Sequence, residues 1–316
     1  MSYCRTLILG AFGQDGRLLT EILKRQPLDE KILVGRTAPN GESIQGSNCR
    51  TFFGDLSDSR FLMTILKRVN PDHIYFLGGV SVNDNSISQT LHRSNYVDPV
   101  NVLLGWASNN QRCRVCIASS VLIYGANPSG KIVESSALNP ESSYAEARAT
   151  IFEIVSSASL PNVVLPVFSN HESHIRTSKH FFGQILYCLS KNTLYDNKND
   201  LEQVRDWGYA KEYMEILPQI MHQKFGGPLI VSTSTAYSCA TIISWFAEVC
   251  PDFQISDATQ KKVLKSTAER HDISQFEYSN DLLVSVINRR VQYHGKNLVN
   301  VLVNNALPQV RRKEMV

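Results

Sequence analysis

A tyrosine and an arginine stand four positions apart at Tyr144 and Arg148. Residues at this spacing share one face of a helix, so the phenol and the guanidinium can act on one bound ligand. A neighbouring cation lowers the pKa of a phenol and can also hold a sugar hydroxyl. Arginine supplies that charge as a wide planar fork that stays protonated, so it positions a ligand without relaying a proton. The pair predicts acid–base chemistry at Tyr144. The non-catalytic alternatives are that Tyr144 is a packed phenol and that Arg148 is a surface residue.

Glycines at positions 10, 13 and 16 follow the first predicted strand, residues 6–9, and open a helix predicted at residues 14–25. Glycine permits a tight turn and a close approach of the backbone to a pyrophosphate. The helix N-terminus adds free N–H groups and a partial positive charge. The order strand, turn, helix favours a dinucleotide site over a glycine-rich turn without a ligand.

Two further residues refine this site. Arg36 follows the strand predicted at residues 32–34, where a dinucleotide with a free ribose hydroxyl would require an acid. A guanidinium suits a 2′-phosphate, so the sequence favours NADP over NAD unless Arg36 is a solvated loop residue. Asp55 follows the strand predicted at residues 51–53 and can accept from an adenine amino group. Its competing role, shared with Ser57, is to cap the helix predicted at residues 57–68.

Short β-rich runs alternate with helical patterns in the first half of the chain, which predicts a Rossmann-type, doubly wound α/β fold with a parallel sheet. Further strands are predicted at residues 73–77, 115–117, 163–167 and 229–232, and further helices at residues 97–109, 144–158, 181–189, 211–222 and 239–249. The pattern loosens beyond about residue 170. We therefore expect an NADP-binding domain at residues 1–169 and, at residues 170–316, mostly a smaller substrate-binding lobe that interleaves with it.

Composition narrows the function classes. The formal net charge of +3 arises from scattered residues, so no nucleic-acid partner is expected. Without a signal peptide or an apolar run near the ~20 residues of a membrane span, the expected location is the cytoplasm, with no membrane partner. Seven dispersed cysteines are predicted to be free thiols. The histidines at positions 171, 174 and 180 lack metal-ligand spacing, so no metal site is predicted.

With these features located, the chain resembles the extended short-chain dehydrogenase/reductase family, and within it the GDP-mannose 4,6-dehydratases, over about residues 5–215. Besides the glycine turn, the runs that carry the resemblance are Asp55-Leu56-Ser57-Asp58, Pro71-Asp72-His73-Ile74-Tyr75, Asn170-His171-Glu172-Ser173 and Arg205-Asp206-Trp207-Gly208-Tyr209-Ala210-Lys211-Glu212-Tyr213. The last two runs point away from unrelated dinucleotide-binding enzymes.

This resemblance implies a site for NADP and a nucleotide sugar. The implied cofactor contacts are Gly10, Gly13, Gln14, Asp15, Gly16, Arg36, Asp55, Leu56, Ser81, Tyr144, His171 and Arg176. The substrate site would include Asn170 and Arg205; Arg205 would contact the diphosphate, unless it forms a structural ion pair. In the family the helices predicted at residues 97–109 and 144–158 form a dimer interface, so a homodimer or higher homo-oligomer is expected.

The sequence also departs from the family. Ser120 falls on the catalytic hydroxyl, but the glutamate expected two residues later is Leu122, which cannot move a proton. Elimination across sugar C5 and C6 needs that base, whose proton transfer is typically worth ~10² to ~10⁴ in rate. Arg148 replaces the family's lysine, and Gly183 and Gln184 replace an Arg-Lys pair that follows the Asn-His-Glu-Ser run. We therefore expect weakened hydride transfer, doubtful dehydration and no assured preference for GDP.

The leading hypothesis is an NADP-dependent oxidoreductase that acts at C4 of a nucleotide sugar, as a ketoreductase or epimerase. Its catalytic residues would be Ser120, Tyr144 and Arg148. One alternative is a GDP-mannose 4,6-dehydratase whose base is supplied from elsewhere. The other is a non-catalytic homologue that keeps the fold and binds the cofactor.

Overall fold

An eight-stranded parallel sheet lies at the centre of the computed structural model, which describes residues 4–25, 29–37, 48–79, 88–197, 200–269 and 276–313. Its strands are β1 (Arg5–Leu9), β2 (Glu30–Gly35), β3 (Cys49–Phe53), β4 (His73–Phe76), β5 (Arg114–Ile117), β6 (Ser119–Ser120), β8 (Val163–Phe168) and β11 (Gly227–Val231). They lie in the order β3, β2, β1, β4, β5, β8, β11, and the short β6 also pairs with β8. This order, which reverses direction between β1 and β4, is that of a doubly wound dinucleotide-binding fold.

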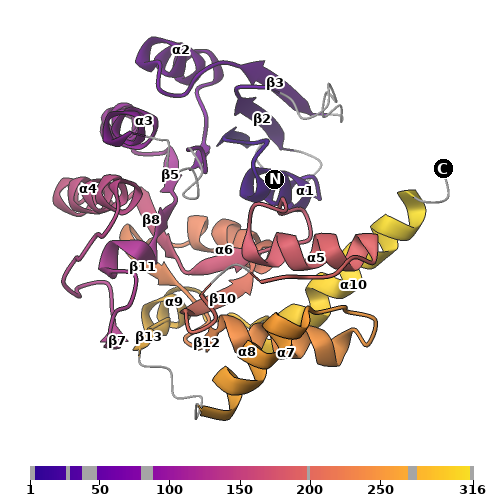
Figure 1. Cartoon of the computed structure of the whole chain (residues 1–316). Coiled ribbons are helices and arrows are strands. Elements are labelled where there is room, and N and C mark those ends of the chain that lie inside the picture. Colours follow the sequence, from indigo (N-terminus) through magenta and orange to yellow (C-terminus); the bar gives the residue numbers. More distant parts are fainter. Residues whose placement is uncertain are drawn as a thin grey trace.

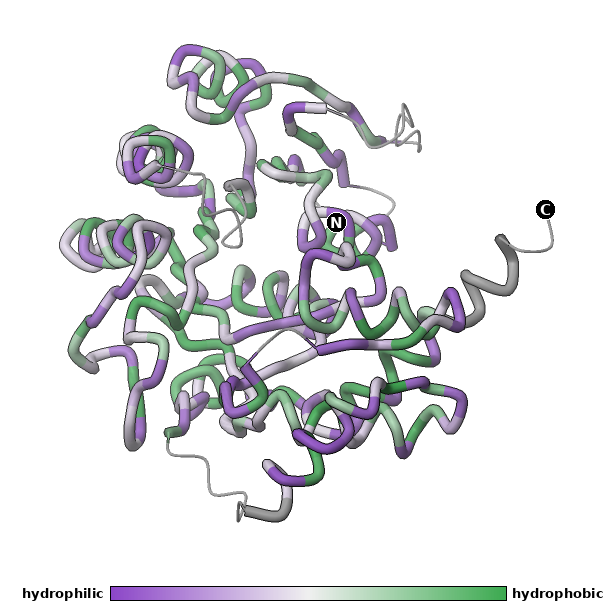
Figure 2. The backbone as a smooth tube through the Cα atoms, viewed as in Figure 1, coloured by the Kyte–Doolittle hydropathy of each residue, from purple (hydrophilic) through white to green (hydrophobic). Residues whose placement is uncertain are grey.

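Helices cover both faces of the sheet (Figure 1). One face carries α2 (Ser59–Val69), α3 (Gln89–Asn109) and α4 (Ser143–Ala158), and the other carries α1 (Gln14–Leu23), α6 (Ala210–Met221) and α9 (Asp281–Ile287). Successive strand residues point to opposite faces, so Leu7 and Leu9 belong to one core and Ile8 to the other. Burial on both faces explains why inner strands such as β1, β4 and β8 contain continuous apolar runs. Figure 2 shows hydrophobic segments within the sheet.

The second half of the chain builds a smaller lobe around a third core. Its three-stranded sheet consists of β9 (Asn170–Glu172), β10 (Val204–Tyr209) and β12 (Ala236–Ser238), with β10 in the middle. The lobe's helices are α5 (Phe181–Lys191), α7 (Cys239–Val249), α8 (Asp257–Glu269) and α10 (Gly295–Lys313). A separate two-stranded sheet joins β7 (Gly130–Ile132) to β13 (Phe276–Tyr278). In Figure 1 this lobe lies below the parallel sheet.

The predicted fold class is confirmed: the sheet is parallel, doubly wound and accompanied by a smaller lobe. The seven cysteines are free thiols, as predicted. Two elements from the second half, α6 and β11, belong to the large sheet and its cover. The domain boundary near residue 170 stays a prediction.

The structure corrects two local predictions, the start of one helix and the caps of another. The helix predicted at residues 97–109 begins at Gln89, where Ser88 caps it by accepting from Leu91 N. The helix after β3 was predicted to be capped by Asp55 or Ser57, but its cap is Asp58, which accepts from Arg60 N and Phe61 N. Asp55 instead accepts from the backbone N–H and hydroxyl of Ser57 through one oxygen, Oδ1.

Candidate active site

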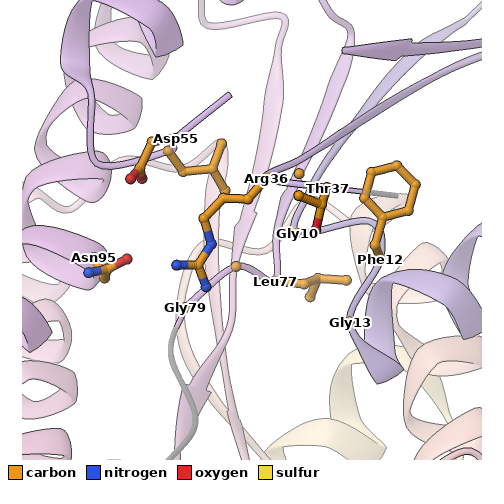
Figure 3. Close-up of a pocket in the computed structure, with 12 residues that line it drawn as sticks. Gly10, Phe12, Gly13, Arg36, Thr37, Asp55, Leu77, Gly79 and Asn95 are labelled. Atoms are coloured by element: carbon orange, nitrogen blue, oxygen red, sulfur yellow. The ribbon is translucent and has the colours of Figure 1, made fainter. Parts of the chain in front are cut away.

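A cavity of about 340 Å³ opens at the carboxyl ends of β1, β2 and β4 (Figure 3). Gly10, at the end of β1, has φ +88, and a Cβ added there would lie 2.5 Å from Gly78 Cα. Only glycine therefore fits this turn. The lining residues are Gly10, Phe12, Gly13, Gly35, Arg36, Thr37, Asp55, Leu56, Leu77, Gly78, Gly79 and Asn95. Five of the predicted cofactor residues (Gly10, Gly13, Arg36, Asp55 and Leu56) thus surround one space of a size typical for ligands.

Arg36 is the charged group that dominates this cavity. Its side chain enters the cavity just after β2, with the guanidinium pointing away from Phe12 (Figure 3). Among the described residues it has no ion-pair partner, and its side chain is exposed. Asp55 lines the same cavity, and one of its carboxylate oxygens is held by Ser57. The cavity therefore offers a cation to an anionic ligand.

The start of α1 is tied to the smaller lobe by side chains that the sequence assigned to the cofactor. Asp15 Oδ2 lies 3.0 Å from Nε2 of His171 on β9. The Ser173 hydroxyl donates to Gln14 Oε1 at 2.8 Å. Burial raises the pKa of Asp15, but the charge and hydrogen bond of His171 outweigh it and bring this pKa to about 2. For His171 the directions are reversed. Burial lowers the pKa of this imidazole, but the charge and hydrogen bond of Asp15 outweigh burial, so the pKa is raised.

Arg176 reinforces the same strand from the loop that follows it. Its Nε donates to Glu172 Oε2 at 3.2 Å, and its Nη2 donates to the His171 carbonyl at 3.3 Å. Burial raises the pKa of the Glu172 carboxyl, and the charge of Arg176 opposes this rise. Four predicted cofactor residues therefore lie together at the join between α1 and β9, namely Gln14, Asp15, His171 and Arg176. Gly16 does not line the cavity but packs on the glycine turn, where an added Cβ would lie 2.3 Å from the Gly10 carbonyl oxygen. Ser81 lies outside the described residues.

Ser120 and Leu122 share the short turn that follows β6. Ser120 precedes the 3-10 helix η2 (Val121–Tyr124), and its Oγ accepts from Leu122 N at 3.3 Å. Leu122 is half-buried. Helix α4 contacts both β6 and η2, which brings the tyrosine helix beside this turn. The hydrogen bond from Leu122 N therefore orients the Ser120 hydroxyl, and the side chain at position 122 is the apolar isobutyl group of leucine.

Tyr144 lies in the first turn of α4, where Ser142 caps the helix by accepting from Ala145 N. Arg148, one turn later, is 7% exposed. Its Nη1 donates to the Ala118 carbonyl at 2.5 Å, and its Cζ lies 5.3 Å from the centre of the Tyr144 ring. Burial lowers the pKa of Arg148, but Tyr144 and Tyr96 outweigh burial and raise it. The arginine is thus a buried cation and not a surface residue.

Sequence reasoning missed the aromatic side chains on α3 that surround this pair. Tyr96 is 1% exposed, and its ring lies 4.0 Å from Arg148 Cζ. His92 stacks on Tyr96 at 5.9 Å and meets Tyr144 edge-on at 6.1 Å between ring centres. The spacing of His92, Tyr96 and Val100 was the available signal, because buried residues four apart share a helix face.

The two predicted substrate residues lie on neighbouring strands of the smaller lobe. Asn170 pairs with Trp207 in the register of β9 and β10. Arg205 donates from Nη1 to the Ala126 carbonyl at 2.8 Å and to Asn127 Oδ1 at 3.4 Å. No ion pair with an acid is found for Arg205 within the described ranges. It is therefore anchored to the segment just after the Ser120 turn and not to a carboxylate.

The family model for GDP-mannose 4,6 dehydratase matches residues 7–283. The chain belongs to this family. A GDP-mannose 4,6 dehydratase of Drosophila melanogaster is 25% identical over 259 residues, which cover 73% of the chain and 64% of that protein. A GDP-mannose 4,6-dehydratase of Vibrio cholerae serotype O1 is 26% identical over 291 residues, which cover 82% and 76%. The chain thus spans about two thirds to three quarters of these relatives.

The fold is also shared with solved nucleotide-sugar enzymes. A dTDP-glucose 4,6-dehydratase of Bacillus anthracis in complex with NAD aligns with a TM-score of 0.76, covering 97% of this chain and 99% of that one at 14% identity. This similarity confirms the extended short-chain dehydrogenase/reductase fold. Substrate, cofactor and reaction type do not follow from it.

One departure from the family pattern has a steric cause. Gly183 stands where the resemblance places an arginine, and a Cβ on it would lie 2.0 Å from the Thr177 carbonyl oxygen. Gly183, in the first turn of helix α5, therefore packs directly on the backbone that follows β9. A longer side chain requires this loop to move away.

In the part of the chain that the structure describes, no group of three His, Cys, Asp or Glu side chains is arranged to hold a metal ion. None of the helices searched there is both long and apolar enough to cross a membrane.

Proposed function

We propose that the protein is an NADP-dependent oxidoreductase that acts at C4 of a nucleotide-linked sugar, as a ketoreductase or as an epimerase that oxidises C4 transiently. The observation that carries the proposal is that Tyr96 contacts both the Tyr144–Arg148 pair and the wall of the cavity. Its ring packs against Tyr144 and Arg148 and also against Gly79, which lines the cavity. A dinucleotide in this cavity would then extend towards the tyrosine.

NADP would supply or accept a hydride at sugar C4 when bound. In the reductive direction Tyr144 would donate its hydroxyl proton to the C4 oxygen while the ketone becomes an alcohol. Ser120 would hold the same oxygen by a hydrogen bond. Arg148 would keep a positive charge beside the phenol, which favours the phenolate left after proton donation.

The preference for NADP rests on Arg36. A guanidinium without an ion-pair partner in the described structure, placed at the end of β2 inside the cavity, suits a 2′-phosphate. The glycine turn at Gly10 and the free N-terminus of α1 suit the pyrophosphate. The residues present therefore fit a phosphorylated dinucleotide.

Incubation with NADPH and a panel of 4-keto nucleotide sugars, followed by cofactor absorbance, tests the reductase form. The epimerase form is tested by NMR of 4-hydroxy nucleotide sugars for inversion at C4. Tyr144→Phe serves as the matched control, because it removes the proton and keeps the ring. If neither panel reacts with the unaltered protein, the proposal is wrong.

A dehydratase is the second candidate, and Glu141 is the observation that favours it. This exposed carboxylate lies in the loop before Tyr144, and its Oε1 would be 3.3 Å from a Cβ on Gly125, at the end of the Leu122 turn. Glu141 would act as the base that Leu122 cannot be. Deuterium incorporation at sugar C5 in heavy water, abolished by Glu141→Gln, is the expected result; unchanged incorporation excludes this role.

A non-catalytic cofactor-binding protein is the third candidate. In that case Tyr144→Phe leaves every measured rate unchanged while NADPH still binds. Loss of turnover in Tyr144→Phe with intact NADPH binding excludes this candidate.

We also propose that two copies pair through α3 and α4. A groove of about 270 Å³ runs between these helices, and Gln89 donates to Glu146 across it at 2.9 Å. The family resemblance gives these helices an interface role. Light scattering that reports a monomer at all working concentrations overturns this proposal.

A further inference from the structure

Tyr96 lies where the cavity meets the Tyr144–Arg148 pair. On one side, Arg148 Cζ lies 4.0 Å from the centre of its ring, and the Tyr144 ring packs edge-on at 5.6 Å. On the other side, a Cβ added to Gly79 would lie 2.0 Å from Tyr96 Cε1. The ring of Tyr96 thus occupies space that only a glycine in the cavity wall leaves free.

The charge of Arg148 needs this ring. Water hardly reaches the guanidinium, which is 7% exposed as a residue, and its Nε has no hydrogen-bond partner among the residues that the structure describes. Its Nη1 bonds to the Ala118 carbonyl. Tyr96 and Tyr144 supply further stabilisation, through their hydroxyls and through their ring faces, since a guanidinium over an aromatic face is held by the ring's electrons.

An arginine requires such support more than a lysine does. A guanidinium is planar and broad, so it can stack flat on a ring, whereas an ammonium is a compact point charge with three donors. The Tyr96 ring, 4.0 Å from Arg148 Cζ, restricts where the guanidinium can lie beside Tyr144. Without the ring, the long arginine side chain has other rotamers open to it.

We propose that Tyr96 is a positioning residue through which Arg148 acts, so that tyrosine and arginine replace the family's lysine as a unit. The inference rests on the proposed function, which places the charge of Arg148 beside the Tyr144 phenol, and it adds a contact between this charge and the nicotinamide ribose. It goes beyond that function by naming a residue on α3 on which the arginine depends. The predicted consequence is energetic coupling between positions 96 and 148.

A double-mutant cycle tests this coupling. In the unaltered background Tyr96→Leu lowers kcat by roughly 10-fold or more with a smaller change in KM, whereas Tyr96→Phe, which keeps the ring, stays within about 3-fold. In the Arg148→Lys background Tyr96→Leu costs less than about 3-fold, because the ammonium does not stack. The pH profile of kcat also moves with Tyr96→Leu only when Arg148 is present. Equal losses in both backgrounds overturn the proposal.

A binding measurement tests the coupling between positions 96 and 148 even if no substrate turns over. The dissociation constants of NADPH and of adenosine 2′,5′-bisphosphate, which lacks the nicotinamide half, are measured for all four proteins of the cycle. We expect Tyr96→Leu to weaken NADPH about 5-fold in the Arg148 background alone, and the bisphosphate to bind all four proteins equally. If Tyr96→Leu weakens both ligands equally, Tyr96 merely shapes the cavity and the proposal fails. NADPH binding without any turnover refutes the proposed function instead.

Discussion

The imidazole of His171 lies 3.0 Å from the carboxylate of Asp15, across the join between the large sheet and the smaller lobe. One residue opens the first helix after the glycine turn, and the other stands in β9. The pair therefore holds the glycine turn against the smaller lobe by an interaction whose strength depends on pH.

The pH dependence of stability should report this pair. Because His171 lowers the pKa of Asp15 to about 2, the carboxylate's contribution is present above its ordinary pKa of 3.8 and is lost as the pH falls through 2. Because Asp15 raises the pKa of His171, the imidazole's contribution is present below its ordinary 6.5 and is lost as the pH rises through the higher folded value. We expect Asp15→Asn to lower the free energy of unfolding by about 2 kcal/mol near pH 5.5, and by less near pH 9.

Urea denaturation at both pH values measures this difference. The double variant Asp15→Asn/His171→Gln is the control, because its second substitution should cost little once the partner is gone. A loss that is the same at both pH values would contradict the ion pair.

Cofactor choice should depend on Arg36. We expect Arg36→Ala to weaken NADPH binding by roughly 10- to 100-fold and to leave NADH binding within about 2-fold, because only the 2′-phosphate loses its charged partner. Fluorescence titration measures both constants. Arg112→Ala is the matched control, since this exposed arginine precedes β5 and so lies at the amino ends of the parallel strands, whereas the cavity lies at their carboxyl ends. Equal weakening of NADPH and NADH would remove Arg36 from the phosphate site.

Restoring an acid at position 122 should restore proton transfer at sugar C5. We expect Leu122→Glu to raise deuterium incorporation at C5 of a 4-keto nucleotide sugar by ~10²-fold or more, because the turn after Ser120 would then carry a positioned base. NMR in heavy water follows the exchange. Leu122→Gln has nearly the same shape and no basic carboxylate, so an equal gain in that variant would refute the expectation.

Gly183 should tolerate no side chain. Since a Cβ there would lie 2.0 Å from the Thr177 carbonyl oxygen, Gly183→Ala should lower the free energy of unfolding by about 1 to 3 kcal/mol. Gly105→Ala is the contrasting substitution, because nothing lies within 4 Å of the added methyl on α3 and alanine favours a helix by up to about 1 kcal/mol. Thermal or urea unfolding compares the two, and equal effects would contradict the steric argument.

The sequence predicted the sheet, its doubly wound class and the cavity-lining residues Gly10, Arg36 and Asp55, because glycine turns and apolar runs are local signals. It did not reveal Tyr96. The mostly polar run at residues 89–95, together with Pro99, concealed the first two turns of α3, so Tyr96 lay outside the predicted helix. The burial of Arg148 also depends on contacts with residues 30 and 52 positions away, Ala118 and Tyr96, which no local pattern encodes.

The place of β11 has a consequence for how the protein is made. β8 would be an open edge of the sheet until residues 227–231 pair with it. During synthesis the first half of the chain therefore leaves the ribosome with one side of the apolar strand β8 unpaired. The sheet is completed only after more than sixty further residues, counted from Phe168 at the end of β8 to Val231, have been added. Release of a chain that ends before β11 would leave this edge free to pair with another copy. Correct folding therefore requires that β11 is synthesised and pairs with β8 before such an encounter.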